Sequence, residues 1–155
     1  MENPTNNAVD FDALVLKTVS PDATIADLDT LYGHAFALPQ WYFIARGESP
    51  NVQPYIAANP AYEDGKYMVR AFTDTDRLQR FVKEHNLETA SGGSMVLSIP
   101  TGPVIEYLEV LMNEGVHGIW FNSDAESYGF FVAIAQLRHI KVRLESLRQE
   151  TRKEV

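Results

Sequence analysis

Between Tyr67 and Asn122 the chain alternates between two hydrophobic patterns, and this alternation constrains the fold more than any other feature. The segments "YMVRAF", "SMVLSIP" and "GIWFN" are short and rich in the β-branched and aromatic residues typical of strands. The two segments between them, "FTDTDRLQRFVKEHN" and "TGPVIEYLEVLMNEG", place apolar residues three and four positions apart, as amphipathic helices do. This order favours parallel strands joined by helical crossovers. We therefore predict an α/β fold with helices packed on the sheet.

The first half of the chain shows a different order of predicted elements. A helix is predicted over residues 20–38, which Pro39 ends, followed by a strand over Gln40–Arg46. A second strand near residues 55–58 and the turn signal Asp64-Gly65 then lead into Tyr67–Phe72. These strands predict an antiparallel meander, so the whole sheet is expected to be mixed. Residues 1–9 are expected to be disordered, and no firm assignment follows for Phe11–Val19.

The C-terminal region is predicted to be one long helix over residues 126–153. Its apolar residues follow the 3-4 spacing of a coiled-coil seam: Phe130, Ala133, Leu137, Ile140, Leu144 and Leu147. Two arrangements fit this pattern. The helix packs across its own domain, which we place at residues 10–135, or it associates with a second copy.

The 155-residue length fits one domain, and the charge is uneven. Residues 1–135 hold 7 Lys/Arg against 18 Asp/Glu, whereas residues 136–155 hold 6 against 3. The formal charge of −8 argues against nucleic-acid binding, which depends on a basic surface. The chain has no cysteine, no run long enough to span a membrane and no signal-peptide pattern near its start. We therefore expect a cytoplasmic protein that binds neither nucleic acid nor membrane.

Polar residues follow the predicted strands and form the candidate ligand site. In α/β sheets, ligands bind beyond the carboxyl ends of parallel strands. The weak candidates there are Thr73, Asp74, Thr101, His117, Asn122 and Ser123. Helix capping uses the same residue types, and the glycines around His117 favour a turn, so a purely structural role competes at each position. The histidines show no metal-binding spacing and no cofactor or catalytic motif is present, so we expect no cofactor, no metal and no catalytic residues.

Aromatic and apolar residues supply the candidate interaction surface. Trp41 and Phe43 alternate with Tyr42 across the first strand, so one set belongs to the core and the other is open to a partner or to the tail. The apolar seam of the C-terminal helix adds Leu137, Ile140, Leu144 and Leu147. Aromatic residues are enriched at interface anchors, although core packing explains the same pattern.

Three short motifs resemble the SseB-type domain, named for an enhanced-serine-sensitivity phenotype. They are Phe72-Thr73 at a strand end, Asp76 with Leu78 at a helix start, and Gly115 to Asn122. The resemblance covers roughly residues 40–125 and leaves out the N-terminal region and the C-terminal helix. It implies the fold, and it carries over no catalytic site.

These observations favour a non-enzymatic, cytoplasmic protein-interaction or regulatory domain, with a protein partner or a second copy as the target. One alternative is a small-ligand-binding protein or enzyme that uses the crevice at the strand ends. Another is a toxin-neutralising, immunity-type protein, since an acidic surface attracts a basic toxin.

Overall fold

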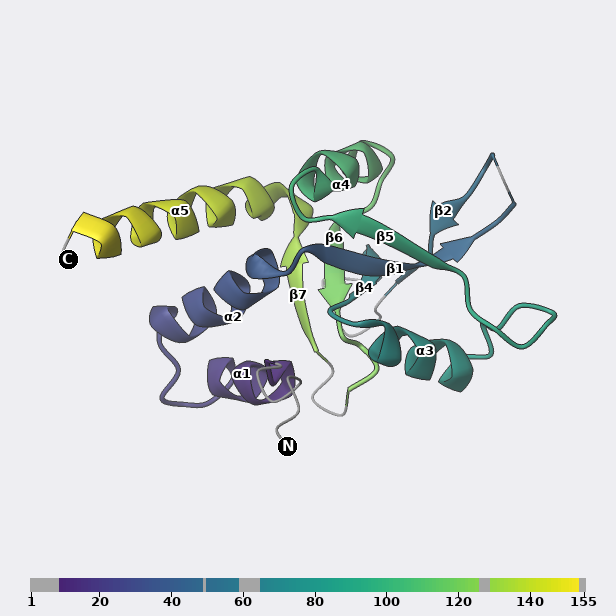
Figure 1. Ribbon diagram of the computed structural model, residues 1–155, viewed down its shortest axis with the longest axis horizontal. Coiled ribbons are helices and arrows are strands. Elements are labelled where there is room, and N and C mark those ends of the chain that lie inside the picture. The colour runs from purple at the N-terminus through teal and green to yellow at the C-terminus, as the bar shows by residue number, and fades with distance from the viewer. Residues whose placement is uncertain (1–8, 49, 59–64, 126–128, 154–155) are drawn as a thin grey trace, which may run out of the picture.

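The computed structural model describes residues 9–48, 50–58, 65–125 and 129–153, where five α-helices pack on a mixed seven-stranded sheet (Figure 1). The elements are α1 (Phe11–Thr18), α2 (Ile25–Ala37), β1 (Gln40–Arg46), β2 (Gln53–Pro54), β3 (Ile56–Ala58), β4 (Tyr67–Phe72), α3 (Thr75–Glu84), β5 (Val96–Pro100), α4 (Val104–Asn113), β6 (Gly118–Phe121), β7 (Phe130–Ala133), the 3-10 helix η3 (Ile134–Gln136) and α5 (Leu137–Lys153). The predicted α/β class is confirmed. The disorder predicted for residues 1–9 falls, apart from Val9, outside the described residues, as does Asp64 of the predicted turn.

The sheet contains both the parallel and the antiparallel strand pairs that the sequence predicted. β4 and β6 are parallel neighbours, and β6 pairs in turn with the antiparallel strand β7. β1 is antiparallel to β4 on one side and to β5 on the other, so β4, β5 and β6 all run in the same direction. The carboxyl ends of β4 and β6 therefore lie next to each other at one edge of the sheet.

β1 and β4 pair directly over only part of their length, because the short strands β2 and β3 lie between them further along. The two strands pair directly at Tyr42–Phe72 and Phe43–Ala71. Further along, β2 pairs with the end of β1 and β3 pairs with the start of β4. Tyr55 joins the two sides, because its N–H donates to the Ile44 carbonyl at 2.8 Å and its carbonyl accepts from the Arg70 N–H at 3.1 Å.

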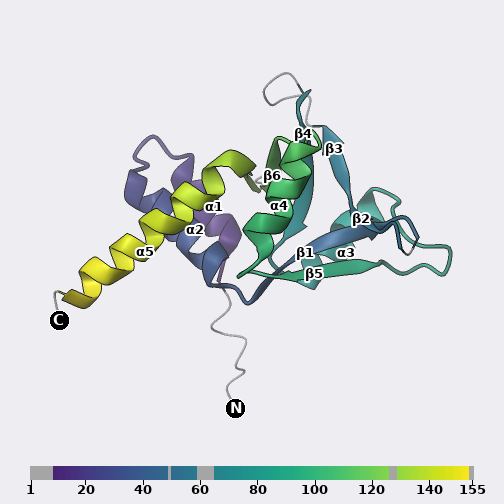
Figure 2. The same cartoon turned by 90° about the horizontal axis from the view of Figure 1, so that it is seen from above.

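The two faces of the sheet carry separate cores. One face holds the larger core, built from Trp41, Phe43 and Phe121 of the sheet with residues of α1, α2, α4 and α5 (Figure 2). The other face holds a smaller core of Ile44 and Phe72 under α3. α3 begins at Asp74, whose carboxylate accepts the Arg77 N–H at 2.8 Å, and it buries Leu78, Phe81 and Val82. Five aromatic side chains are fully buried in the two cores: Trp41, Phe43, Phe72 and Phe121 from the sheet, and Phe81 from α3.

The segment that the sequence left unassigned is α1. Asp10 caps it by accepting the Ala13 N–H at 3.1 Å. One side of α1 is buried through Phe11 and Val15, and α1 packs against α2. Phe11 stacks on Phe130 with ring centroids 6.3 Å apart, which joins the helical layer to β7.

The prediction of one helix over residues 126–153 is wrong in its first part. Phe130–Ala133 is strand β7, and α5 begins only at Leu137. The side chains of β7 alternate, with Phe130 and Val132 buried and Phe131 exposed, because the strand completes the hydrogen bonding of β6. Gly129 precedes it with φ of +64°, and a Cβ there would lie 1.8 Å from the Phe121 carbonyl oxygen. Only glycine fits this close approach.

Candidate functional site

Thr73 and Asn122 meet where β4 and β6 end, as the sequence predicted. The Asn122 side-chain oxygen accepts the Thr73 N–H at 3.0 Å, and the Asn122 amide donates to the Thr73 hydroxyl at 3.1 Å. Asn122 is 1 % exposed and Thr73 is 7 % exposed. Asn122 has φ of +55°, a left-handed conformation that asparagine adopts more readily than most residues. The pair therefore ties two parallel strands together, and its polar atoms are used within the chain.

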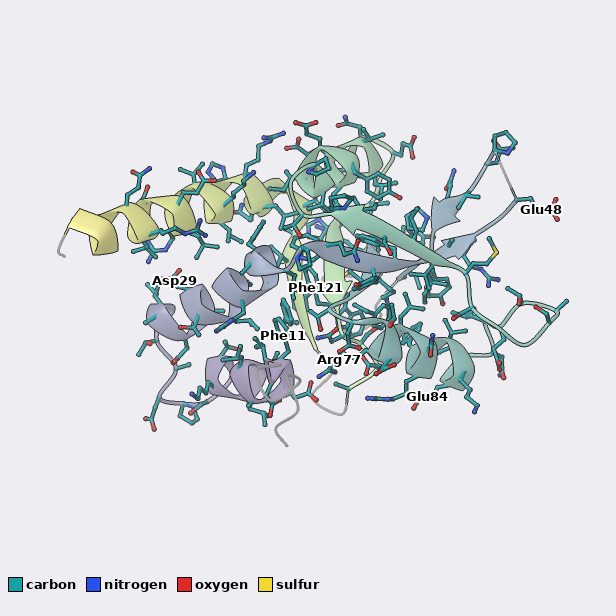
Figure 3. All side chains as sticks on the ribbon, viewed as in Figure 1. Phe11, Asp29, Glu48, Arg77, Glu84 and Phe121 are labelled. Carbon is teal, nitrogen blue, oxygen red and sulfur yellow. The ribbon has the colours of Figure 1, made fainter. Side chains whose placement is uncertain are left out.

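A cluster of ion pairs lies beside the Thr73–Asn122 pair, and no local pattern in the sequence predicts it. The Asp124 carboxylate has no exposed surface, and its Oδ2 lies 3.5 Å from Arg77 Nη1 and 3.1 Å from Arg80 Nη1. Arg77 also lies 3.2 Å from Asp12 of α1 and 3.8 Å from Asp74. Figure 3 shows Arg77 between α1 and α3. The cluster joins α1, α3 and the segment after β6.

Burial dominates the electrostatics of this cluster. Burial raises the pKa of Asp124 above its ordinary value, although the nearby Arg77 and Arg80 act in the opposite direction. Its Oδ1 is buried and has no hydrogen-bond partner within the described residues, while Oδ2 takes both arginines. The carboxylate is therefore held by its cations at one oxygen only.

Ser123 contacts Arg70 on the face of the sheet that α3 covers. Its hydroxyl accepts a hydrogen bond from Arg70 Nη1 at 3.2 Å. Arg70 belongs to the middle of β4 and is 8 % exposed. Ser123 is thus close to a buried cation, which the sequence did not predict because 53 residues separate the two positions.

Two predicted members of this site lie elsewhere. His117 precedes β6, whereas Asn122 follows it, so they are at opposite ends of the strand. The His117 backbone joins β4 to η3, because its N–H donates to Tyr67 and its carbonyl accepts from Ile134. Thr101 follows β5, which β1 separates from β4, and its hydroxyl donates to the Leu38 carbonyl. The grouping of His117 with Asn122 is therefore wrong, whereas Thr101 lies at the predicted edge of the sheet but is separated from Thr73 by β1.

The predicted aromatic interaction surface is also wrong for two of its three members. Trp41 and Phe43 are fully buried in the larger core, and the Trp41 indole donates to the Ala35 carbonyl at 2.8 Å. Tyr42 faces the smaller core and is half-buried, with its hydroxyl accepting from the Gln40 side chain at 2.9 Å. β1 is therefore an interior strand on both faces.

The apolar seam of α5 is partly used within the chain. Leu137 is 1 % exposed and Ile140 packs against the larger core. Leu144 then crosses α2 at Gly33, where a Cβ would lie 4.0 Å from the leucine side chain. Beyond this crossing, α5 extends past the other helices, as both views show (Figures 1 and 2). The first arrangement, packing on the domain, thus describes the first half of the helix.

Two bidentate ion pairs hold α5 in this position. Arg138 binds both oxygens of Glu109 on α4 through Nε and Nη2, each at 2.7 Å. Arg143 binds both oxygens of Asp29 on α2 in the same way, at 2.9 Å. These hydrogen bonds lower the pKa of Glu109 and of Asp29. Both pairs are fork-to-fork contacts, which fix orientation as well as distance.

The helical hairpin of α1 and α2 carries four exposed apolar residues, and its turn lies at the end of the molecule toward which α5 projects (Figure 1). We call the four residues Leu16, Val19, Ile25 and Leu28 the hairpin tip. Their exposed fractions are 58 %, 72 %, 67 % and 38 %. Val142 of α5 is 61 % exposed as well. Contiguous exposed apolar surface marks interaction sites. Leu16 and Val19 were missed because Phe11–Val19 had no assigned structure, whereas Ile25 and Leu28 lie in a helix that was predicted.

Comparisons with known proteins give no relative for this chain: no family model, no curated protein and no solved structure matches it. The resemblance to the SseB-type domain over residues 40–125 therefore stays a prediction. In the described part of the chain, no group of His, Asp and Glu side chains is placed to hold a metal ion. No helix within the described ranges is long and apolar enough to cross a membrane.

Proposed function

We propose that the chain is a non-enzymatic protein-interaction module of the cytoplasm and that its first partner is a second copy of itself. The observation that carries this proposal is the hairpin tip. Four large apolar side chains are exposed on two adjoining helix ends, and burying them would contribute roughly 25 cal/mol per Å² of apolar surface. Isolated exposed leucines are ordinary in soluble proteins, but a cluster on one short connection is not.

Charge complementarity supports a second copy as the occupant. The body of the chain is acidic and the region of α5 is basic. Asp22 lies exposed in the connection of the hairpin tip, and Arg148 lies exposed on α5. Because the tip and the projecting part of α5 lie at the same end, a two-fold axis lets each copy place its α5 on the tip of the other. The pairing is then reciprocal and closed.

The self-association is tested on the full chain, because Leu137 and Ile140 belong to the core and removal of α5 would disturb the fold. We expect a dimer by sedimentation equilibrium, and dissociation to monomer in the double substitution Leu16→Ser with Ile25→Ser. Both side chains are exposed, so the substitutions leave the core intact. Val110→Ser is the matched control, since Val110 is 58 % exposed on α4, away from the hairpin tip.

The outcome separates the alternatives. A dimer that persists in the double variant would place the interface elsewhere and contradict the role of the hairpin tip. A parent chain that stays monomeric at high protein concentration would contradict self-association. Salt dependence gives a further readout, because contacts between the acidic body and α5 weaken as ionic strength rises.

A further inference from the structure

Arg70 is the most unusual charged residue of the described chain. It lies in the middle of β4 and is 8 % exposed. Its guanidinium carbon lies 4.0 Å from the ring centroid of Trp120 and 5.7 Å from that of Phe81. Nη1 donates to the Ser123 hydroxyl at 3.2 Å. The guanidinium is therefore held by aromatic rings and one neutral hydrogen bond.

Among the described residues, no hydrogen bond joins a partner to the other edge of this guanidinium, Nε with Nη2. Nε is buried and has no hydrogen-bond partner in the described part of the chain, and no described carboxylate lies within 4.0 Å. Arg138 and Arg143 provide the comparison within the same molecule. Each of them uses Nε and Nη2 together to bind both oxygens of a carboxylate. At Arg70 no carboxylate of the described residues occupies the corresponding edge.

Such an arrangement costs free energy in the ligand-free chain. A buried guanidinium loses hydration, and stacking on an aromatic ring replaces only part of it. Burial accordingly lowers the pKa of Arg70. The neighbouring carboxylate does not relieve the deficit, because the Asp124 oxygen that meets cations is paired with Arg77 and Arg80. An anion bound to Arg70 would satisfy the charge and the unpaired donor together.

We propose that Arg70, with Ser123 and the ring of Trp120, forms a binding site for a small oxyanion, a carboxylate or a phosphate, at the Nε–Nη2 edge. Trp120 holds the guanidinium plane, and Ser123 holds Nη1 so that the opposite edge faces the ligand. Bidentate recognition by arginine suits both anion types. Because Nε is covered in the ligand-free chain, binding requires a shift of the groups around it, and Trp120 reports that shift.

The test uses the ¹⁵N-labelled full-length chain and its two tryptophan indole signals. Trp41 is fully buried in the other core and serves as an internal reference. Inorganic phosphate and acetate are titrated separately, at constant ionic strength maintained with chloride. We expect a saturable shift of the Trp120 indole signal with little change at Trp41. Saturation by phosphate alone identifies a phosphate site, and saturation by acetate identifies a carboxylate site.

Arg70→Met is the decisive variant, and Arg46→Met is its charge-matched control. Arg46 lies exposed at the end of β1 and donates to the Leu87 carbonyl. The saturable shift should be lost in Arg70→Met and kept in Arg46→Met. Without anion, Arg70→Met should unfold at the same denaturant concentration as the parent or at a higher one, since it removes an unpaired buried charge.

Two results would overturn the proposal. One is the absence of a saturable shift with either anion in the parent, or a shift that Arg70→Met leaves unchanged. The other is a large loss of stability in ligand-free Arg70→Met, which would make Arg70 a structural contact of the smaller core. Ser123→Ala provides a milder variant, in which binding should weaken severalfold while the fold is kept. The site does not depend on the proposed dimer, because it involves neither the hairpin tip nor α5.

Discussion

The arginines of α5 and the arginines of α3, which lie beside the ends of β4 and β6, meet carboxylates in opposite surroundings. Arg138 and Arg143 are about half exposed, and each binds both oxygens of one carboxylate. Arg77 and Arg80 share a single oxygen of the buried Asp124. The pKa of Asp29 is lowered mainly by its hydrogen bond from Arg143, whereas burial raises the pKa of Asp124 despite two cations.

The difference shows that the geometry of an ion pair matters less than its access to water. On the surface, water solvates whatever the pair leaves unsatisfied, so α5 is oriented at little cost and with little gain in stability. At the strand ends, water does not solvate a buried atom that lacks a partner. Removing one member of a pair therefore leaves the other unpaired, at its full desolvation cost. Substitutions in the two regions should therefore differ in size and in salt dependence.

The largest effect is expected at Asn122, the polar residue with the least exposure. Asn122→Ala leaves the buried Thr73 N–H and hydroxyl without their partner and places alanine at a positive φ, so we expect a loss of about 3 kcal/mol in the free energy of unfolding. Equilibrium unfolding in urea measures it. Asn122→Gly keeps the backbone conformation accessible and should lose less. Equal losses in both variants would show that the φ angle contributes nothing.

A smaller loss, about 2 kcal/mol, is expected for Arg77→Met, because Arg80 still holds Asp124. In this variant the pKa of Asp124 is raised further, because the Arg77 charge no longer opposes the effect of burial. A carboxyl whose folded pKa is raised contributes stability below its unfolded value, 3.8, and loses it as pH rises. The deficit of Arg77→Met relative to the parent should therefore grow as pH rises above the folded pKa of Asp124 in the parent, which itself lies above 3.8. Arg80→Met, at a more exposed side chain, is the control with the smaller loss, and a deficit independent of pH would contradict the role of Asp124.

Local patterns predicted the fold wherever neighbouring residues decide the structure. β1 at Gln40–Arg46 and β4 at Tyr67–Phe72 match their predicted bounds. The error at Phe130–Ala133 arose because apolar residues three and four apart also fit the start of a helix. Pairing with β6 decides in favour of a strand, and that contact is not local in the sequence. Gly129, just before it, was the available signal for a break.

The candidate site was predictable only in part. Thr73 and Asn122 were found because both follow strands of the same direction, whose ends must meet. His117 was misplaced although its position before Gly118 already puts it at the opposite end of that strand. Arg70 and Asp124 were missed because their importance comes from burial and from contacts over more than 40 residues. A single sequence has no pattern for either.

The smallest effect is expected at the outer pairs. Arg143→Met should lower stability slightly at low ionic strength and not at all in concentrated salt, because water and ions screen an exposed pair. The pKa of Asp29 is lowered, so its contribution is present above the ordinary value of 3.8 and is lost as pH falls below it. Hydrogen exchange adds a local readout, since Arg138→Met with Arg143→Met should speed exchange in α5 and leave β4 and β6 unchanged. A stability loss as large as that of Arg77→Met, or one that persists in salt, would show that α5 is held as firmly as the strand ends and would remove the contrast between the two regions.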